Sequence, residues 1–489
     1  MVFSGLIFVY AFLPLSLLFY CLSKSITAKN TVLLIFSLLF YAWGEPTFVL
    51  VLIFMTFCDF LAAKAIEGAK NKAVRKLLLF LSVAVNIGII GFFKYTGFIL
   101  TNFNALTGAS CKIPEIALPI GISFYTFQLL SYVVDVYRKE APAQKSFSLL
   151  LLYSSLFYQC IAGPIVRYKD INNELLHRKT NITLISNGIT RFTVGLAKKA
   201  LIANMCGSLS SSLLVEDNAF ATAEGALKAV AELSEKSALG LWFGVGFYML
   251  QIYLDFSAYS DMAIGMGYMV GFKFKENFDY PYSAKSVTDF WRKWHISLSS
   301  FFRDYVYIPL GGNRKGKVRT YINLLVVWFL TGLWHGASWN FILWGLYYFL
   351  FLVAEKAGLL KVLEKAPKLL GRVYLLIIVF FGWILFKFSY TEAIPVVVKG
   401  LFTLNGNAGT DFETKTLLRK NVLFIISAVV SVTPLVHKIK TVFENKSKKS
   451  KGTAVFYSVL QVVSPIVLLF LSTLALVGDS YNPFLYFQF

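Results

Sequence analysis

Apolar runs long enough to cross a bilayer recur along almost the whole chain. A helix needs roughly 20 apolar residues to cross a hydrocarbon core about 30 Å thick. The predicted spans are 5–23, 31–44, 47–63, 77–99, 116–136, 200–214, 239–258, 321–337, 339–354, 373–391, 421–437 and 456–477. The pattern predicts an all-α, polytopic membrane protein with about 11–12 transmembrane helices, plus re-entrant or interfacial helices around a central tunnel.

The connections between these runs carry much of the lysine and arginine. Basic loops are retained on the cytoplasmic side of a membrane, so this charge pattern predicts the connections that face the cytoplasm. They are 64–76, 138–145, 272–320, 356–372 and 438–451. Strict alternation would place the basic stretch 167–179 outside, but the run before it ends in a helix-breaking Ala-Gly-Pro. We therefore interpret 146–162 as re-entrant, and expect both termini outside.

A histidine interrupts the tryptophan-rich apolar run 328–344. Ionisable side chains inside a membrane are rare and usually face a bundle interior or a wet cavity, so His335 is a functional candidate. If the helix continues past it, Thr331 and Ser338 share its face and form a narrow polar stripe suited to lining a tunnel. The alternative is a histidine that hydrogen-bonds a neighbouring helix only for packing.

Two aspartates also lie within or next to an apolar run. Asp255 and Asp261 each follow a polar residue by four positions, Gln251 and Ser257, so each aspartate belongs to a polar stripe on one predicted helix. Such carboxylates could orient a histidine or hold the hydroxyls of a donor. Helix-to-helix hydrogen bonding explains them equally well.

The segment 280–313 mixes aromatic and basic residues without a complete spanning run. This mixture is typical of an interfacial or re-entrant helix against the cytoplasmic face. The excess of lysine and arginine over the wider stretch 272–320 would attract anionic lipid headgroups, nucleotide phosphates or an acidic carrier protein. Lipid contact and topology alone would account for most of that charge.

Composition excludes several other classes. The 489 residues are 57% hydrophobic and 15% charged, and the net charge of +21 is explained by topology rather than by nucleic-acid binding. The five cysteines are scattered without any Cys-x-x-Cys spacing, so no disulfide framework is expected. The four histidines show no metal-ligand spacing, and no metal site is predicted.

Several longer motifs, taken in order, resemble one known family. They occupy 118–128, 162–167, 255–265, 290–299, 307–313 and 333–336. Together they resemble the membrane-bound O-acyltransferase superfamily, in its bacterial alginate O-acetylation and peptidoglycan O-acetyltransferase branch. The resemblance extends over nearly the whole chain and implies a single transmembrane domain over 1–489, with the core motifs in 110–355.

The resemblance implies acyl transfer across the plasma membrane. A thioester donor, with acetyl-coenzyme A expected as co-substrate and no bound cofactor, would be used on the cytoplasmic side. The acyl group would reach a cell-envelope or exported polysaccharide through an extracytoplasmic partner of the SGNH/GDSL type. Membrane lipids are the other expected partners. His335 matches the family's catalytic histidine, and His295 matches its second histidine.

The resemblance adds further candidate residues. Those on the donor side or in the tunnel are Asp255, Asp261, Trp291, Arg292, Arg303, Asn313, Trp334 and Ser338. The tail 480–489 looks like an aromatic C-terminal motif of envelope-acylation systems, which makes Tyr486 a hypothetical acyl relay. The alternative for Tyr486 is an aromatic anchor at the membrane interface.

Two other functions stay open at this point. One is D-alanyl transfer toward teichoic acid from a carrier protein, whose enzymes share the core around His335. The other belongs to a different class, a transporter of polysaccharide or lipid-linked saccharide in which the buried histidine and aspartates serve substrate or proton passage.

Overall fold

The computed structural model describes residues 1–161, 163–478 and 485, and within this part of the chain all regular elements are helices. The predicted all-α class is confirmed. The chain divides into two compact units. The first contains Met1–Leu196, Tyr259–Asn277 and the described part of Leu476–Gln488, and the second contains Ala197–Ala258 and Phe278–Ala475. Helix α13 (Ala238–Val270) contributes to both.

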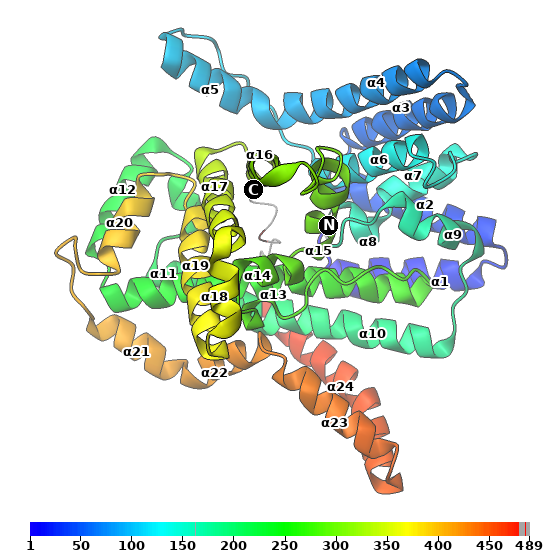
Figure 1. Ribbon diagram of the computed structural model, residues 1–489. Helices are drawn as coiled ribbons and strands as arrows, with labels where there is room; N and C mark the ends of the chain where they lie inside the picture. The colour runs from blue at the N-terminus through cyan, green and yellow to red at the C-terminus, as the bar shows by residue number, and fades with distance from the viewer. Residues whose placement is uncertain (162, 479–484, 486–489) are drawn as a thin grey trace. The chain divides into compact units, whose positions relative to one another are not determined.

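The first unit is built mainly from the N-terminal helices. They are η1 (Phe8–Phe12), α1 (Leu13–Leu22), α2 (Ile26–Gly44), α3 (Val49–Gly68), α4 (Lys72–Ile90), η2 (Gly91–Tyr95), α5 (Thr96–Thr107), α6 (Ile122–Tyr137), α7 (Phe147–Ser155), α8 (Phe157–Cys160), α9 (Tyr168–His177) and α10 (Ile182–Ala197). Helix α3 runs beside α4 (Figure 1) and also packs on α6 and α7.

A buried carboxylate fixes α3 against α4. Asp59 is fully buried and accepts hydrogen bonds from Ser82 Oγ at 2.5 Å and from Asn86 Nδ2 at 2.9 Å. Within a bilayer, lipid tails are as apolar as the helix surfaces, so hydrogen bonds and close packing hold helices together. The three side chains therefore supply a specific contact that apolar burial alone would not.

Arg178 fastens the end of α9 to two distant segments of the same unit. Its guanidinium donates to Asn30 Oδ1 at 2.6 Å and to the Val270 carbonyl, at the end of α13, at 3.2 Å. The last carbonyls of a helix have no partner within the helix and favour a nearby cation. Arg178 thus satisfies the C-terminus of α13 and orders the basic stretch that follows α9.

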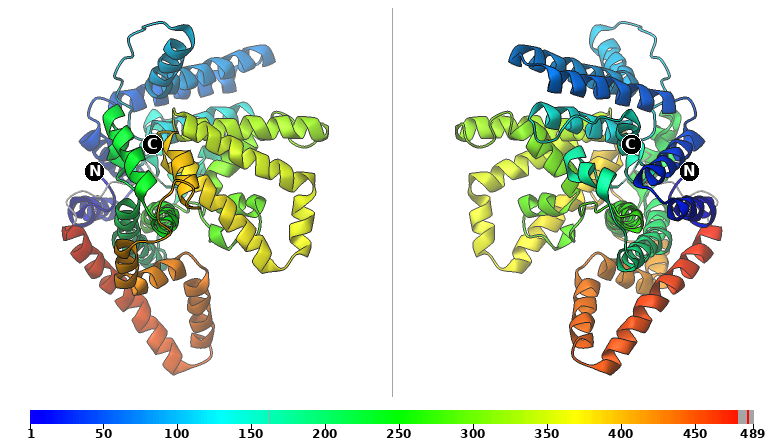
Figure 2. Two further views of the ribbon diagram at one scale, coloured as in Figure 1. Left: turned by 90° about the vertical axis from the view of Figure 1, so that its left-hand side faces the viewer. Right: turned by 90° about the vertical axis from the view of Figure 1, so that its right-hand side faces the viewer.

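The second unit contains most of the remaining helices. They are η3 (Lys198–Ala203), α11 (Asn204–Leu213), η4 (Asp217–Phe220), α12 (Ala223–Glu235), η5 (Pro281–Ser283), α14 (Val287–Lys293), α15 (Ile296–Phe302), η6 (Arg303–Tyr307), α16 (Gly316–His335), α17 (Trp339–Ala354), η7 (Glu355–Leu359), α18 (Leu360–Lys365), α19 (Lys368–Lys387), α20 (Ala393–Gly400), α21 (Phe412–Lys420), α22 (Val422–Ser431), α23 (Leu435–Ser447) and α24 (Lys451–Gly478). In Figure 2, α23 and α24 form an open hairpin, and the rings of Phe443 and Phe456 are 6.1 Å apart.

Six helical segments of the described residues are long and apolar enough to cross a membrane. They are α2, α3, the continuous stretch Lys72–Thr107, α13, α19 and α24. Helices α22 and α23 add a seventh if they are counted together, although the chain bends by 67° between them; the sequence predicted a span over 421–437. The larger count of about 11–12 spans stays a prediction.

The other predicted spans are shorter or more polar helices. Helices α6 and α17 have 16 residues each, fewer than a straight crossing requires. Helix α16 begins at Gly316 and carries Lys317 and Arg319 in its first turn. The run 146–162, interpreted as re-entrant, is broken at Leu156 between α7 and α8. Segment 280–313 forms short helices and no span, as its mixed composition predicted.

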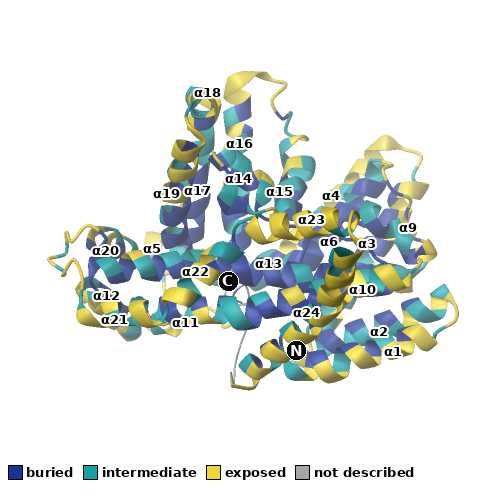
Figure 3. Ribbon diagram, turned by 90° about the horizontal axis from the view of Figure 1, so that it is seen from below, coloured by how far each residue is buried: buried dark blue, intermediate teal, exposed yellow. Residues whose placement is uncertain are grey.

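Burial differs sharply between the long helices. Figure 3 shows α13 largely buried, whereas α23 and much of α24 are exposed. Exposed positions on α24 include Val455, Val462 and Ile466, each about two-thirds exposed. A helix with an exposed apolar surface is stable only where that surface meets lipid or another protein. The exposed apolar surface of α24 is therefore suited to contact lipid or another protein, whereas α13 is an internal helix.

Candidate active site

His335 is the last residue of α16, at the tip of a tight helical hairpin. The helix ends there because Gly336 is extended, with φ −169°, and α17 begins three residues later at Trp339. The two helices touch backbone to backbone. A Cβ at Gly332 would collide with the Phe341 carbonyl oxygen, and one at Gly345 with the Trp328 carbonyl oxygen. These two glycines let the helices approach closely, as small residues do in membrane proteins.

Aromatic rings surround the His335 imidazole. Its ring centroid lies 4.9 Å from that of Trp344, 5.0 Å from Trp334 and 5.1 Å from Phe386, and the side chain is buried. Phe341 stacks against it at 6.3 Å. Such a wall excludes water from the imidazole and lowers the local dielectric, which strengthens every hydrogen bond that the imidazole makes to a reactant.

The predicted polar stripe around His335 is wrong. Ser338 is outside α16, because the helix ends at His335; it is the N-cap residue of α17, and its side chain makes no capping hydrogen bond. Thr331 is on α16, but its hydroxyl donates to the Val327 carbonyl at 2.7 Å within the same helix. The surroundings of His335 therefore differ from the prediction, and aromatic rings of Trp334, Trp344 and Phe386 contact the His335 ring.

His295 has a different local structure. It joins α14 to α15 with φ 43° and ψ 55°, a left-handed conformation that is uncommon for residues other than glycine. Its side chain is 1% exposed, Nδ1 lies 3.3 Å from Ser297 Oγ, and the Phe256 ring stands edge-on at 4.6 Å. Burial lowers the pKa of His295 to about 3, so the imidazole is neutral at physiological pH.

The two histidines share one neighbour. The ring centroid of Trp334 lies 5.8 Å from that of His295 and 5.0 Å from that of His335. Trp334 is itself buried. The structure therefore brings together three of the residues predicted from the sequence, His295, Trp334 and His335, although His295 and His335 are 40 positions apart in the chain.

Trp291 belongs to the same aromatic assembly. Its ring is edge-on to Trp328 at 4.8 Å, to Tyr348 at 4.9 Å and to Trp344 at 5.5 Å. Because Trp344 also contacts His335, helix α14 is packed against the hairpin that carries the histidine. These contacts pack α14 against the hairpin, and the donor-side role of Trp291 stays a prediction.

A buried glutamate that the sequence did not single out fixes the start of α14. Glu355 is 1% exposed, and its carboxylate accepts hydrogen bonds from the backbone N–H of Val287 at 2.6 Å and of Thr288 at 2.8 Å. Tyr374 donates to it at 3.2 Å. The first N–H groups of a helix lack partners and favour a negative charge. Glu355 therefore ties the end of α17 to the helix that leads to His295.

Asn340 plays a similar part near His335. It is completely buried, and its Nδ2 donates to the carbonyls of Leu385 at 3.2 Å and Phe386 at 3.3 Å, in the last turn of α19. Unpaired carbonyls at a helix end require such a donor. Asn340 thereby holds Phe386, which contacts the His335 ring. The sequence did contain a signal for this residue, because Asn340 is a polar residue within an apolar run.

The two aspartates of α13 form separate ion pairs. In the second unit, Asp255 is 2.8 Å from Lys199 Nζ, and both side chains are almost completely buried. In the first unit, Asp261 accepts from Arg191 Nε at 3.0 Å, and Arg191 also bonds Glu276. Both aspartates thus make the helix-to-helix contacts that were the alternative interpretation, and their donor-side role stays a prediction.

The remaining donor-side candidates are on the surface. Arg292, Arg303 and Asn313 are exposed. Arg303 is engaged by its neighbour Asp304 at 2.7 Å. The loop that ends at Asn313 is held by Asn323 of α16, which donates to the Gly312 carbonyl at 2.9 Å. Exposed cations of this kind are available to a charged donor but are not gathered around either histidine.

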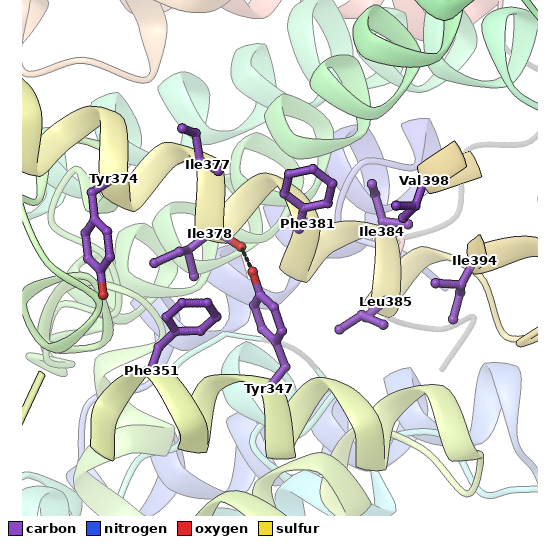
Figure 4. A pocket seen from close by; sticks show the side chains of 10 residues that line it. All are labelled: Tyr347, Phe351, Tyr374, Ile377, Ile378, Phe381, Ile384, Leu385, Ile394 and Val398. Carbon is purple, nitrogen blue, oxygen red and sulfur yellow. Dashed lines mark hydrogen bonds between the residues drawn. The ribbon is translucent and has the colours of Figure 1, made fainter. Parts of the chain in front are cut away.

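An apolar cavity of about 550 Å³ lies between α17, α19 and α20, as Figure 4 shows. Aliphatic and aromatic side chains line it, and the Tyr347 hydroxyl is already bonded to the Ile378 carbonyl at 2.8 Å. No predicted site residue lines this cavity. It can accept hydrocarbon, and the second tyrosine hydroxyl of its lining, that of Tyr374, is engaged by Glu355.

Two further predictions concern metal and the C-terminal tail. Across the described residues, no three His, Cys, Asp or Glu side chains are grouped so that they could hold a metal ion. Tyr486, the hypothetical acyl relay, lies outside the described residues.

Comparisons with known proteins agree on one family. The family model described as MBOAT, the membrane-bound O-acyltransferase family, matches residues 35–390, which include both histidines. A probable alginate O-acetylase from Azotobacter vinelandii is 34% identical, with 100% of each chain covered. The peptidoglycan O-acetyltransferase of Helicobacter pylori is 32% identical over 100% of this chain and 98% of its own. The teichoic acid D-alanyltransferase of Streptococcus thermophilus is 27% identical over 50% of this chain and 58% of its own.

Proposed function

Because the chain belongs to the membrane-bound O-acyltransferase family, we propose that it transfers an acetyl group from a cytoplasmic thioester, through the plasma membrane of a bacterium, to a cell-envelope or exported polysaccharide. The protein is a multi-pass membrane acyltransferase. The observation that supports His335 as its catalytic base is the enclosure of this histidine by Trp334, Trp344 and Phe386 at the tip of the α16–α17 hairpin.

The proposed reaction is a direct acyl transfer. A neutral His335 imidazole accepts the proton of an acceptor hydroxyl as its oxygen attacks the thioester carbonyl carbon. The new C–O bond forms, the C–S bond breaks, and the imidazolium returns the proton to the departing thiolate. Exclusion of water by the surrounding rings protects the thioester from hydrolysis.

His295 has a positioning role in this proposal. A neutral imidazole can donate one hydrogen bond and accept another, but it does not supply positive charge to a phosphate. Its contact with Trp334, the neighbour of His335, suits a group that orients the donor near the catalytic base. Arg292 and Arg303, exposed on the same segment, would meet the phosphates of acetyl-coenzyme A.

The proposal retains the acyl relay through Tyr486 and an extracytoplasmic partner of the SGNH/GDSL type. It also retains both termini outside the cytoplasm, which would put the tail where that partner could take the acyl group. The support for a polysaccharide acceptor is the similarity over the full chain to relatives named for alginate and peptidoglycan O-acetylation.

Radiolabelled acetyl-coenzyme A given to the purified protein in nanodiscs tests both parts. We expect thioester cleavage and label on the wild-type protein, neither in His335→Ala, and loss of the label together with a fall in cleavage in Tyr486→Phe, because that variant lacks the acceptor hydroxyl. The Phe variant keeps an aromatic anchor and loses only the nucleophile. Label on Tyr486→Phe at the wild-type level would contradict the hypothesis that Tyr486 carries the acyl group. Cleavage by His335→Ala at the wild-type rate would contradict the proposal that His335 is the catalytic base.

D-alanyl transfer is the second candidate, since about half of the chain is 27% identical to a teichoic acid D-alanyltransferase. A wild-type protein that ignores acetyl-coenzyme A but accepts a D-alanyl carrier protein would favour it. The transporter hypothesis is not retained, because the matching family consists of acyltransferases.

A further inference from the structure

A polar hollow of about 710 Å³ lies in the first unit, away from both histidines in the chain. The α3–α4 connection, with Glu67, Lys70 and Arg75, lines one side, and the residues after α6, from Lys139 to Pro142, line the other. Its volume is within the range of roughly 300–1,000 Å³ that small-molecule sites occupy. No residue assigned to acyl transfer belongs to it.

Direct contacts join the two sides of the hollow. Arg75 Nη2 donates to the Tyr137 carbonyl at 2.7 Å, at the end of α6, and Glu67 Oε1 accepts from the Ala143 N–H at 2.9 Å. The two segments, 64–76 and 138–145, are both basic connections that the sequence placed on the cytoplasmic side. Their contact agrees with a common side. The two hydrogen bonds also join the segments, so that both line one pocket.

The cations of the hollow are not neutralised. Among the described residues, no carboxylate lies within ion-pair distance of Lys70, Arg75 or Lys139. Of the two acids that line the hollow, Glu140 pairs with Lys169 at 2.5 Å, outside the lining, and Glu67 is engaged by a backbone N–H. The hollow is therefore lined by three basic side chains whose positive charge no carboxylate of the described residues neutralises. This arrangement favours the binding of an anion.

Lys139 has an unusual backbone. It follows α6 with φ 63°, in the left-handed position that ends many helices and is usually glycine. A lysine there costs conformational energy that glycine would avoid. Strain of this kind, combined with a side chain that lines a pocket, points to a use for that side chain.

We propose that this hollow binds the phosphate of an anionic phospholipid headgroup. The hollow adjoins the ends of α3 and of the stretch that begins at Lys72, both apolar enough to cross a membrane, so it lies at the level of headgroups. Basic pockets between transmembrane helices on this side bind such lipids, and each Lys or Arg near the surface contributes.

The test uses the full-length purified protein in detergent, with phosphatidylglycerol, phosphatidylcholine or soluble glycerol phosphate added. Thermal shift and native mass spectrometry report binding. The variants are Lys70→Gln/Lys139→Gln and, as a control with the same charge change, Lys446→Gln/Lys449→Gln, whose side chains are exposed at the end of α23. Phosphatidylglycerol should stabilise the wild type and the control equally, and the first variant should bind it about 10-fold more weakly.

Lys139→Gly separates binding from folding. Glycine relieves the left-handed strain, so this variant should unfold at a higher temperature without lipid, yet gain less on adding phosphatidylglycerol. Equal lipid shifts in all proteins, or an equal loss in the Lys446/Lys449 control, would overturn the proposal in favour of diffuse attraction. A full shift by glycerol phosphate alone would also overturn the lipid assignment and leave a site for soluble phosphate esters.

Discussion

The two histidines of the candidate site are buried by opposite means. His335 ends a regular 20-residue helix, and four aromatic rings hold its imidazole from outside. His295 lies between two seven-residue helices, and its own strained backbone sets the direction of its side chain. One imidazole is positioned by its neighbours and the other by its main chain. Substitutions should therefore affect the two sites differently.

The largest expected effect is at His335. Replacement by Ala should lower acyl transfer by about 10²–10⁴-fold, the usual contribution of a general base, with little change in donor binding. Steady-state kinetics with labelled donor measures it. Thr331→Ala on the same helix is the matched control and should stay within about 2-fold, because that hydroxyl bonds only its own backbone. Equal losses in both would mean that the hairpin is sensitive to any change.

The next largest effect is at His295, where two substitutions separate the contribution of the side chain to turnover from that of the backbone conformation to stability. Both His295→Ala and His295→Gly should lose about 10–100-fold in turnover, equivalent to one or two hydrogen bonds in the transition state. Gly should nevertheless give the more stable protein, by roughly 1 kcal/mol, because it adopts the left-handed conformation freely. Unfolding in detergent measures this difference. A His295→Ala protein at least as stable as His295→Gly would contradict the strained geometry.

Substitution of Glu355 tests whether catalysis depends on the position of α14, the helix that precedes His295. Glu355→Ala should lower kcat about 10-fold with a smaller change in KM, because two orphaned N–H groups, worth about 1–3 kcal/mol each, loosen the start of α14. Glu355→Gln retains one acceptor oxygen and should recover part of kcat. The control is Glu364→Ala, an exposed glutamate in the following helix. A fall in stability without a kcat defect would restrict Glu355 to folding.

The smallest effect is a dependence of stability on pH. The unfolded chain binds a proton at His295 below about pH 6.5, whereas burial lowers its folded pKa to about 3. The unfolded state therefore binds more protons in this window, so stability falls as pH drops and is unaffected above it. Melting curves between about pH 4.5 and 7.5 should show a shallower loss for His295→Asn, which tolerates the left-handed conformation. Parallel curves would refute the lowered pKa.

The hydrophobic pattern was sufficient to predict the helical class and the buried, apolar setting of His335, because a histidine in a long apolar run stands out without knowledge of its contacts. It failed at Ser338, where periodicity was extended past Gly336, although the helix ends at His335. The bend between α22 and α23 was missed for the same reason, since apolar composition continues through it.

Contacts between distant segments could not be predicted from the hydrophobic pattern. Glu355 serves the N–H of Val287, 68 positions earlier, and a glutamate at the edge of a basic loop gives no sign of that. The ion pair of Lys199 with Asp255 likewise joins two segments that no local pattern links. The conformation of His295 was also unpredictable, because left-handed φ values are common only for residues such as glycine.

The glycine contacts of the α16–α17 hairpin have a consequence for how turnover is organised. With Gly332 against the Phe341 backbone and Gly345 against the Trp328 backbone, neither helix can slide or rotate without a steric collision. His335 is then a stationary point during the catalytic cycle. In the proposed reaction, donor and acceptor therefore travel to His335, and the distance crossed in each turnover is covered by the substrates, not by the protein.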